Sequence, residues 1–134
     1  MYAPAYGDEA PIAALATPPA ESALTLIRTS GKDAPALAAP FFSRPEKLLR
    51  APGNTVAHGW IMDGKERLDE VLVSVFRAPR SYTGEDALDI CCHGGRAAAQ
   101  AVLGALKKAG FRDALPGEFT FRAFMNGKLD LTRA

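Results

Sequence analysis

The segment LDICCHGGRAAA, residues 88–99, gathers the residue types of this chain that are best suited to chemistry. Cys91 and Cys92 are adjacent, His93 follows them, and Gly94 and Gly95 come next. This combination could belong to a zinc site, to a cysteine nucleophile with a histidine base, or to a turn that holds an anion. The three alternatives make different demands on the rest of the sequence.

The zinc and nucleophile alternatives find little support elsewhere in the chain. A structural zinc site needs four Cys or His ligands at spacings such as C-x2-C, and the sequence supplies only Cys91, Cys92, His58 and His93. Cys91 and His93 would share one face of a strand, but no activating base or oxyanion site accompanies them. Both cysteines are therefore expected to be thiols packed in a sheet, and the sequence predicts no catalytic residue and no metal ligand.

The glycines favour the third alternative. His93, Gly94 and Gly95 come where an expected strand ends and an expected helix begins. Backbone N–H groups at a helix start attract a carboxylate or a phosphate, although a tight turn alone also calls for glycine. Both interpretations can hold at once, so these three residues are candidates for binding an anionic ligand.

Three charged residues of the sequence could likewise either face solvent or bind a ligand. Asp89 lies in an otherwise apolar strand, where a carboxylate is costly to bury without a partner, so it either faces solvent or binds something. Arg28 shares a strand face with Leu24 and Leu26, near the strand end, where a guanidinium commonly reaches water. Lys128, in the turn NGKLD, is expected on its own to be solvated.

The elements that would position these residues form an α+β domain with a mainly antiparallel mixed sheet and two helices. The expected strands cover 11–17, 23–31, the two halves of 55–79 around an Asp63-Gly64 turn, and 87–93. The expected helices cover 30–42, capped by Ser30 or Asp33 and interrupted at Pro40, and 96–110, ended by Gly110. The other stretches are expected to be a surface connection (43–54), a polar loop (80–86) and an irregular or partly stranded tail (111–134).

The composition of the chain further limits the class of protein and the partners that it can have. The chain has 134 residues, 48% of them hydrophobic and 23% charged, which fits one ordinary soluble domain over 1–134. Its formal net charge of +1 predicts no strong nonspecific attraction to nucleic acids or membrane surfaces, so any binding of a polyanion has to be local. No apolar run approaches the roughly 20 residues that span a bilayer, so we expect a cytoplasmic protein with no membrane partner. Neither a P-loop nor a G-x-G-x-x-G motif occurs.

Three blocks carry a resemblance to a known family. They cover residues 12–31, 67–95 and 115–134 and include YTGED, CHGG and PGEFT-x-RAF-x-NGKLDL, in that order. Together they closely resemble the N-terminal domain of the tRNA modification GTPase called TrmE or MnmE. The resemblance covers nearly the whole chain, and only residues 40–66 have no features that carry it.

The resemblance implies a domain that binds a tetrahydrofolate carrying a one-carbon unit, formyl or methylene, and that joins two copies of the protein as a homodimer. It implies a fold similar to the folate-binding domain of the glycine-cleavage aminomethyltransferase. In the family, helices and a GTPase that uses GTP, magnesium and potassium follow this domain, so the chain is expected to be an N-terminal fragment without the GTPase centre. The implied partners are a flavin-dependent, GidA/MnmG-like subunit and tRNA, whose wobble uridine is modified.

The resemblance also implies which residues hold the folate. The family uses an arginine in the strand IIR-x-SG, an acid before the HGG turn and the lysine of NGKLDL. On this chain they correspond to Arg28, Asp89 and Lys128, with His93, Gly94 and Gly95 at the adjoining turn. A carboxylate can accept two hydrogen bonds from the amino-pyrimidinone edge of a pterin, while cations suit the glutamate tail.

Two departures from the family bear on affinity. Asp89 stands where the family usually has Glu, so the acid must approach the ligand more closely or bridge through water. Residues 20–23 read Ala-Glu-Ser-Ala where the family usually has Gly-Arg-Gly-Gly, which removes a cation and adds an acid. Two other hypotheses therefore stay open: a purely structural dimerisation module with a degenerate folate pocket, and an aminomethyltransferase-like enzyme whose second half comes from a dimer.

Overall fold

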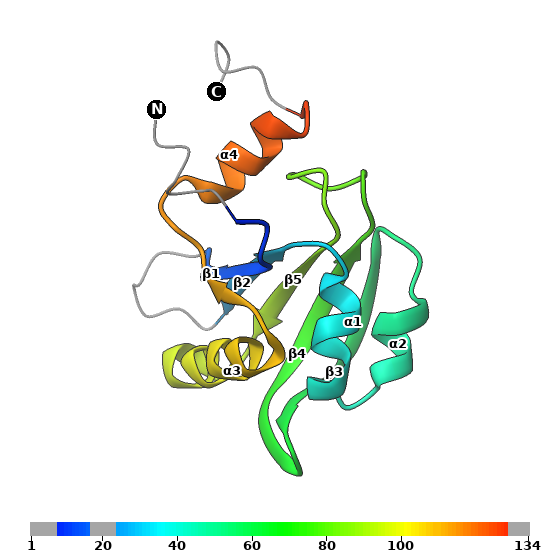
Figure 1. Ribbon diagram of the computed structural model, residues 1–134. Helices are drawn as coiled ribbons and strands as arrows, with labels where there is room; N and C mark the ends of the chain where they lie inside the picture. The colour runs from blue at the N-terminus through cyan, green and yellow to red at the C-terminus, as the bar shows by residue number, and fades with distance from the viewer. Residues whose placement is uncertain (1–7, 17–23, 129–134) are drawn as a thin grey trace.

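The computed structural model describes residues 8–16 and 24–128, and a six-stranded sheet runs through it (Figure 1). Every neighbouring pair of strands is antiparallel except β1 and β6, which are parallel. The predicted α+β class with a mainly antiparallel mixed sheet is confirmed. In spatial order the strands are β3 (Thr55–Asp63), β4 (Glu66–Phe76), β5 (Ala87–Cys92), β2 (Thr25–Ser30), β1 (Ile12–Leu15) and β6 (Arg112–Asp113).

The long β3–β4 hairpin follows the turn signal in the sequence. Asp63 pairs with Glu66, so the turn residues are Gly64 and Lys65, one position later than predicted. Gly64 has a φ of 61°, which glycine adopts without the steric cost of a Cβ atom. The hairpin places β4 beside β5, the strand that carries Asp89.

Three helices cover one face of the sheet, α1 (Ala34–Ala38), α2 (Pro45–Arg50) and α3 (Gly95–Ala109) (Figure 1). Their apolar side chains pack against those of the strands in a single core. The buried residues of this core include Ile27, Leu48, Val71, Val73, Val75, Leu88, Ile90, Val102 and Leu106.

The strand β5 shows how side chains divide between this covered face and the open face opposite. Leu88, Ile90 and Cys92 enter the core, whereas Asp89 and Cys91 are only half-buried. The reason is that successive side chains of a strand point to opposite faces. The predicted divergence of the two thiols is confirmed, and Asp89 lies on the open face.

The ends of the two predicted helices follow their sequence signals. Helix α1 ends before Pro40, which lies in the 3-10 turn η2 (Ala39–Phe41). Asp33 is the N-cap of α1, although its side chain makes no capping hydrogen bond. Helix α3 ends at Gly110, whose φ of 118° and backbone N–H bonds to the last turn form the expected C-cap.

Two further helices correct the prediction of only two. Residues 43–54, expected as a surface connection, contain α2, which begins at Pro45 and buries Leu48 completely. Proline suits a first helical position because the N–H group there has no acceptor within the helix. With 6 residues, α2 is too short to show the apolar periodicity on which a sequence prediction depends.

Helix α4 (Glu118–Met125) is the second correction, because it lies in the tail 111–134 that the sequence predicts to be irregular or partly stranded. The short strand β6 is the stranded part of that tail. Gly117, with a φ of 76°, is the N-cap of α4, and the inward face of the helix carries the charged residues Glu118 and Arg122. Buried charges break the apolar pattern by which a helix is recognised in a sequence.

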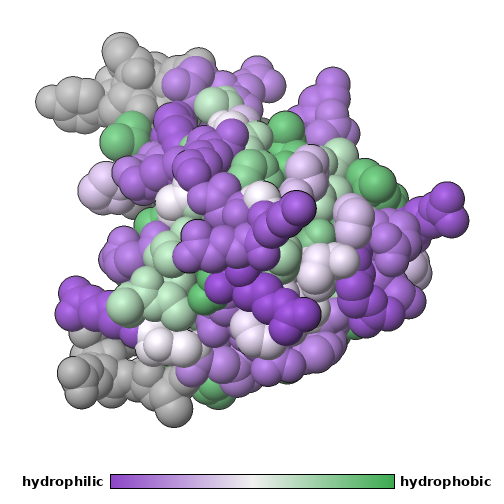
Figure 2. Space-filling view, turned by 90° about the horizontal axis from the view of Figure 1, so that it is seen from below, coloured by the Kyte–Doolittle hydropathy of each residue, from purple (hydrophilic) through white to green (hydrophobic). Residues whose placement is uncertain are grey.

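The surface is mixed in character. Hydrophilic residues cover most of the face seen from below, and hydrophobic residues lie in small groups between them (Figure 2). No helix in the described part of the chain is long and apolar enough to cross a membrane.

Candidate functional site

Arg28 and Asp89 oppose each other on the open face of the sheet. They are directly paired residues of the neighbouring strands β2 and β5, so their side chains leave the sheet on the same side. Arg28 Nε lies 3.6 Å from Asp89 Oδ1, and the two side chains are 40% and 23% exposed. The structure thus brings together two of the residues that the sequence singled out.

The contact between Arg28 and Asp89 is electrostatic, because 3.6 Å is longer than a hydrogen bond. Apart from Arg28, no donor of a described residue contacts the Asp89 carboxylate. Burial raises the pKa of Asp89, and the positive charge of Arg28 opposes that rise. Asp89 therefore keeps acceptor capacity in surroundings that disfavour its charge.

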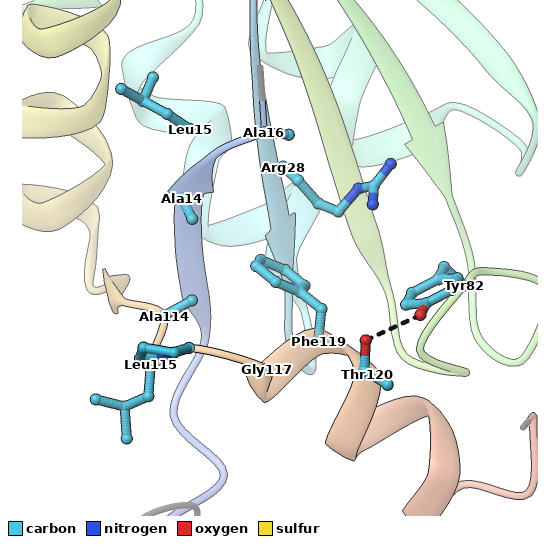
Figure 3. Close-up of a pocket in the computed structure, with 11 residues that line it drawn as sticks. Ala14, Leu15, Ala16, Arg28, Tyr82, Ala114, Leu115, Gly117, Phe119 and Thr120 are labelled. Carbon is cyan, nitrogen blue, oxygen red and sulfur yellow. Dashed lines mark hydrogen bonds between the residues drawn. The ribbon is translucent and has the colours of Figure 1, made fainter. Parts of the chain in front are cut away.

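Two cavities open beside Arg28, and Figure 3 shows the residues that line the larger of the two. One of about 440 Å³ extends from Arg28 along β1 to the start of α4, and one of about 220 Å³ reaches Asp89 and Phe76. Arg28, Tyr82 and Phe119 line both. The Arg28 guanidinium lies 5.8 Å from the centre of the Tyr82 ring, which is a cation–π contact. The site thus combines aromatic walls with one acid and one cation.

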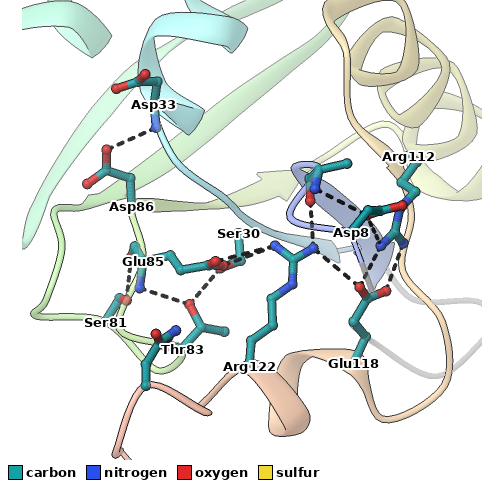
Figure 4. Close-up of polar contacts among 12 residues, drawn as sticks. Asp8, Ser30, Asp33, Ser81, Thr83, Glu85, Asp86, Arg112, Glu118 and Arg122 are labelled. Atoms are coloured by element: carbon teal, nitrogen blue, oxygen red, sulfur yellow. Dashed lines mark hydrogen bonds and ion pairs between the residues drawn. The ribbon is translucent and has the colours of Figure 1, made fainter. Parts of the chain in front are cut away.

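Helix α4, which carries Phe119, is held by buried charges at its start (Figure 4). Glu118 is completely buried and accepts hydrogen bonds from two Arg112 nitrogens at 2.8 and 2.6 Å. It also accepts one from Arg122 at 3.2 Å and one from the Leu115 N–H at 2.9 Å. Burial raises the pKa of Glu118, but these donors outweigh burial and hold the pKa below its usual value. The satisfied carboxylate fixes α4 to the chain that precedes it.

The same network fixes the loop that carries Tyr82 (Figure 4). Arg122 donates to Glu85 Oε1 at 3.1 Å, and Ser30 Oγ of β2 donates to the same oxygen at 2.6 Å. The Tyr82 hydroxyl lies 3.1 Å from the Thr120 hydroxyl of α4 (Figure 3). A single set of polar contacts therefore positions both aromatic walls of the cavities.

Lys128 lies beside the loop 80–86 and lines neither cavity. Its side chain is exposed, as expected, and its Nζ donates to the Pro79 carbonyl at 3.2 Å. A Cβ atom on Gly84 would lie 3.4 Å from Lys128 Cγ. The structure thus places Lys128 behind the loop that carries Tyr82 rather than against the Arg28–Asp89 pair.

His93, Gly94 and Gly95 form the predicted turn from β5 into α3 but line neither cavity. The carboxylate that this turn attracts belongs to the protein itself. The His93 N–H donates to Oδ2 of the buried Asp69, from β4, at 2.8 Å. A Cβ atom on Gly94 would lie 2.9 Å from Asp69 Oδ1, so the glycine gives this carboxylate room. The turn is present, and an internal acid occupies it.

Both cysteines are free thiols, as the sequence predicts. Burial raises the pKa of Cys92 to about 12, and the nearby Asp69 adds to the shift. Cys91 is half-buried on the open face, between Leu26 and Leu72 in the register of the sheet. No group of three His, Cys, Asp or Glu side chains in the described ranges could hold a metal ion.

The aromatic walls are the part of the site that sequence reasoning misses. Tyr82 lies in YTGED and Phe119 in PGEFT, where neither residue belongs to a periodic pattern. Glu118 and Arg122 did leave a signal, because acid and base four residues apart indicate an ion pair on a helix. That spacing could have indicated α4. The altered stretch 20–23 lies outside the described residues.

The arrangement suits a planar ligand whose edge donates hydrogen bonds. Asp89 offers the acceptor, while Tyr82 and Phe119 offer apolar faces. Arg28 supplies a cation at the junction of the two cavities, where it can meet an anionic part of the same ligand.

Comparison with known proteins identifies the family of this chain. The chain matches the family described as GTP-binding protein TrmE N-terminus over residues 11–128. It is 52% identical over 126 residues to the tRNA modification GTPase MnmE of Treponema denticola, a match that covers 92% of this chain and 27% of that protein. The tRNA modification GTPase MnmE of Moorella thermoacetica is 52% identical over 128 residues, and this match covers 92% of this chain and 28% of that protein.

A third relative extends the match to nearly all of the chain. The tRNA modification GTPase MnmE of Treponema pallidum (strain Nichols) is 50% identical over 133 residues, which cover 99% of this chain and 27% of that protein. The chain therefore spans little more than a quarter of the length of these relatives. Since the family match contains every described strand and helix, this chain belongs to the GTP-binding protein TrmE N-terminus family.

Proposed function

We propose that this domain binds a reduced folate, a tetrahydrofolate carrying a formyl or methylene unit, in the cavities beside Arg28 and Asp89. The observation that carries the proposal is the Asp89 carboxylate, which lines a cavity of about 220 Å³ and keeps acceptor capacity beside Arg28. The amino-pyrimidinone edge of a pterin presents N–H groups that can donate hydrogen bonds to a single carboxylate. Membership of the family supports the proposal through the folate site that the sequence resemblance implies.

Each candidate residue has a part in the proposal. Asp89 accepts hydrogen bonds from the N–H groups of the pterin edge. Tyr82 and Phe119 contact the faces of the ring system. Arg28 supplies a cation inside the cavities for a carboxylate of the ligand, whereas Lys128, which lines neither cavity, can meet only a glutamate tail that extends beyond them. Because Asp89 is shorter than the usual glutamate of the family, the pterin lies closer to β5 or is bridged by water.

His93, Gly94 and Gly95 act on the ligand indirectly in this proposal. The Asp69 carboxylate already takes the His93 N–H, so the turn holds the end of β5, the strand that carries Asp89. Folate itself carries the one-carbon unit, and the domain orients and shields it without a nucleophile of its own.

We place the domain in a larger protein of the kind for which its relatives are named, a tRNA modification GTPase. In this proposal GTP, magnesium and potassium bind a separate GTPase domain, and a flavin-dependent, GidA/MnmG-like subunit meets the folate at the wobble uridine of a tRNA. The setting is the cytoplasm, with no membrane contact. The likeness of the fold to the folate-binding domain of the glycine-cleavage aminomethyltransferase is part of the same proposal.

Titration calorimetry with 5-formyltetrahydrofolate tests the proposal, with GTP as a ligand that this domain does not bind. We expect one folate site per chain and weaker binding by Arg28→Ala, by about 10- to 150-fold if a charge-assisted bond is lost. Absence of folate binding by the wild-type chain would favour the structural-module hypothesis. An Arg28→Ala variant with a lower melting temperature but the same affinity would make Arg28 a structural residue.

The open face of the sheet favours a second function, the joining of two copies of the chain. Leu24, Val56 and Leu72 are 49%, 63% and 39% exposed. Leu72 pairs across the strands with Cys91, which pairs with Leu26, so apolar side chains cross the middle of this face. Large exposed apolar residues indicate a surface that a partner covers, and one face can serve both copies of a symmetric dimer.

Light scattering coupled to size-exclusion chromatography tests the homodimer. We expect the wild-type chain to run as a dimer and Leu72→Glu to shift it toward the monomer, because a charge in the interface has no partner. Leu49→Glu is the matched control, since Leu49 is exposed on α2, which packs on the covered face. A monomeric wild-type chain at high concentration would overturn this function without affecting the folate titration.

A further inference from the structure

A third cavity, of about 530 Å³, lies between α2 and the first half of β3. Among the described residues it shares no lining residue with the two cavities beside Arg28. We call it the basic groove, because its lining includes Arg44, Lys47, Arg50 and His58. It falls within residues 40–66, the stretch that carries none of the family's sequence features.

We propose that the basic groove binds the phosphate backbone of an RNA strand. Arg44, the N-cap of α2, is followed by Lys47 and Arg50 at three-residue intervals, which makes them neighbours on one side of the helix. With a rise of about 1.5 Å per residue, they form a row roughly 9 Å long. Such a row can meet more than one phosphate of a strand that runs along the groove.

The charge of this row is available to a ligand. Lys47 and Arg50 are exposed and form no ion pair with any residue that the structure describes. Arg44 donates one hydrogen bond to the His58 carbonyl at 3.1 Å, which leaves its other guanidinium N–H groups for a ligand. Glu46 is the one acid among the lining residues, and Glu70 lies 2.6 Å from the His58 ring, so the positive charge of the groove comes from Arg44, Lys47 and Arg50.

The fold also holds helix α2, which carries these cations, in place. Leu48 of α2 is completely buried, between Lys47 and Arg50 in the sequence. Arg77 donates to the carbonyls of Leu48 at 2.8 Å and of Ala51 at 3.0 Å, which ties the end of α2 to the chain that follows β4. The cations are therefore placed by the fold before any ligand arrives, which lowers the entropic cost of binding.

An RNA strand fits the groove better than a peptide that adds to the sheet as a further strand. A peptide that adds to the sheet needs a free edge on β3. That edge is already in use, because the Ser43 N–H donates to the Trp60 carbonyl at 2.9 Å and the Trp60 N–H donates to Ser43 Oγ at 2.9 Å. Within the part of β3 that lines the groove, the His58 carbonyl is held by Arg44, so only residues 55–57 remain there.

Arginine forks and a lysine point charge bind phosphates directly, as they also bind carboxylates, so the tRNA and poly-glutamate arms of the experiment separate the two ligands. With a net charge of only +1, the chain would owe its attraction to RNA to this local row. The inference rests on the proposed function to the extent that a protein acting on tRNA must meet RNA.

Fluorescence anisotropy of this chain with a labelled, unmodified tRNA transcript tests the inference. We expect Lys47→Gln/Arg50→Gln to weaken binding roughly 10-fold or more at low salt. The slope of log affinity against log salt should also flatten, by about 0.7–0.9 for each phosphate that the variant no longer neutralises. Lys32→Gln/Arg96→Gln is the matched control, because it removes the same charge from exposed residues outside the groove, and its affinity should stay within about twofold of wild type.

Several results would overturn the inference. Equal losses in the two double variants would mean general electrostatic attraction, and a wild-type chain that does not bind tRNA would remove the site. Loss of binding to poly-glutamate with unchanged tRNA binding would make the ligand an acidic peptide. Folate titration of the same variants keeps the two proposals apart, since groove variants should bind folate as wild type does. If no variant binds folate but only the groove variant loses tRNA, the inference stands and the folate proposal falls.

Discussion

Arg28 and Asp89 stand opposite each other on adjacent strands, 3.6 Å apart, without a hydrogen bond between them. Asp89 is close enough to Arg28 for electrostatic attraction. The contact leaves lone pairs on the Asp89 carboxylate oxygens that can accept hydrogen bonds from a ligand. Arg28 lines both cavities and Asp89 lines the smaller one, and the Arg28 guanidinium lies over the Tyr82 ring. The pair therefore forms the polar centre of an otherwise aromatic site.

Asp89→Asn should make the domain more stable at neutral pH. Burial raises the pKa of Asp89 above its ordinary 3.8, so the folded protein holds a proton there more tightly than the unfolded chain does. The stability that this gives is complete below the ordinary pKa and is lost as the pH rises through the folded pKa. We expect the melting temperature of Asp89→Asn, followed by circular dichroism, to exceed that of wild type by about 1–4 °C at pH 7.

The gain should shrink as the pH falls through the raised pKa of Asp89, because the folded wild-type protein takes up the proton there. A variant that melts below wild type at pH 7 would show that the attraction of Arg28 outweighs the effect of burial.

Glu118→Gln should destabilise the domain severely. The change removes the charge that Arg112 and Arg122 share in a completely buried position, and breaking such a pair costs about 3–5 kcal/mol. Urea denaturation measures this loss. Asp113→Asn, which removes an exposed partner of Lys107, is the control and should cost less than about 1 kcal/mol.

The same carboxylate gives a pH dependence of the opposite sign to that of Asp89. Because the pKa of Glu118 is lowered in the fold, its contribution is complete above the ordinary value of 4.5 and is lost as the pH falls through the folded pKa. The wild-type chain should therefore lose stability on acidification in a step that Glu118→Gln lacks. Parallel pH profiles of the two proteins would contradict this role.

Two glycine substitutions near and within α3 should have opposite effects. A Cβ atom on Gly94 would meet Ala98 Cβ at 2.6 Å and Asp69 Oδ1 at 2.9 Å, so Gly94→Ala should cost about 1–3 kcal/mol. Gly104 is exposed inside the helix with nothing within 4 Å, so Gly104→Ala should add about 0.5–1 kcal/mol. Chemical denaturation of both variants checks the pair. Equal stabilities would mean that the turn relaxes freely around a methyl group.

In the monomeric Leu72→Glu variant, where no second copy covers the open face, iodoacetamide should label Cys91 well before Cys92. Burial holds the pKa of Cys92 near 12, so almost no thiolate exists there at pH 8, whereas Cys91 is half-buried on the open face. Peptide mass spectrometry after timed alkylation separates the two sites. We also expect Cys91→Ser to bind folate as wild type does, because the proposal gives neither thiol a chemical role. Faster labelling of Cys92 would contradict the orientation of β5.

Local signals in the sequence predicted most of the sheet, since alternation in β2 and β5 and a glycine turn in the hairpin need no distant information. The same alternation placed Arg28 and Asp89 on strand faces. It could not place them opposite each other, because the β2–β5 register depends on long-range pairing. Their association with one site came only from the family resemblance.

The parts that sequence reasoning missed depend on tertiary contacts. Helix α4 buries its charged residues Glu118 and Arg122, and the sequence alone does not show their partners Arg112 and Glu85. The HGG turn shows the converse case. Its N–H groups do attract a carboxylate, but only the packing of β4 shows that the carboxylate is Asp69.

Calorimetric titration of 5-formyltetrahydrofolate into Asp89→Ala, beside Glu70→Ala as control, tests the central claim most directly. Glu70 is an acid on the neighbouring strand β4 that lines neither cavity and pairs with His58. We predict that Asp89→Ala loses about 2–5 kcal/mol of binding free energy while Glu70→Ala binds as wild type does. Unchanged affinity in Asp89→Ala, or an equal loss in Glu70→Ala, would contradict the placement of the folate against Asp89.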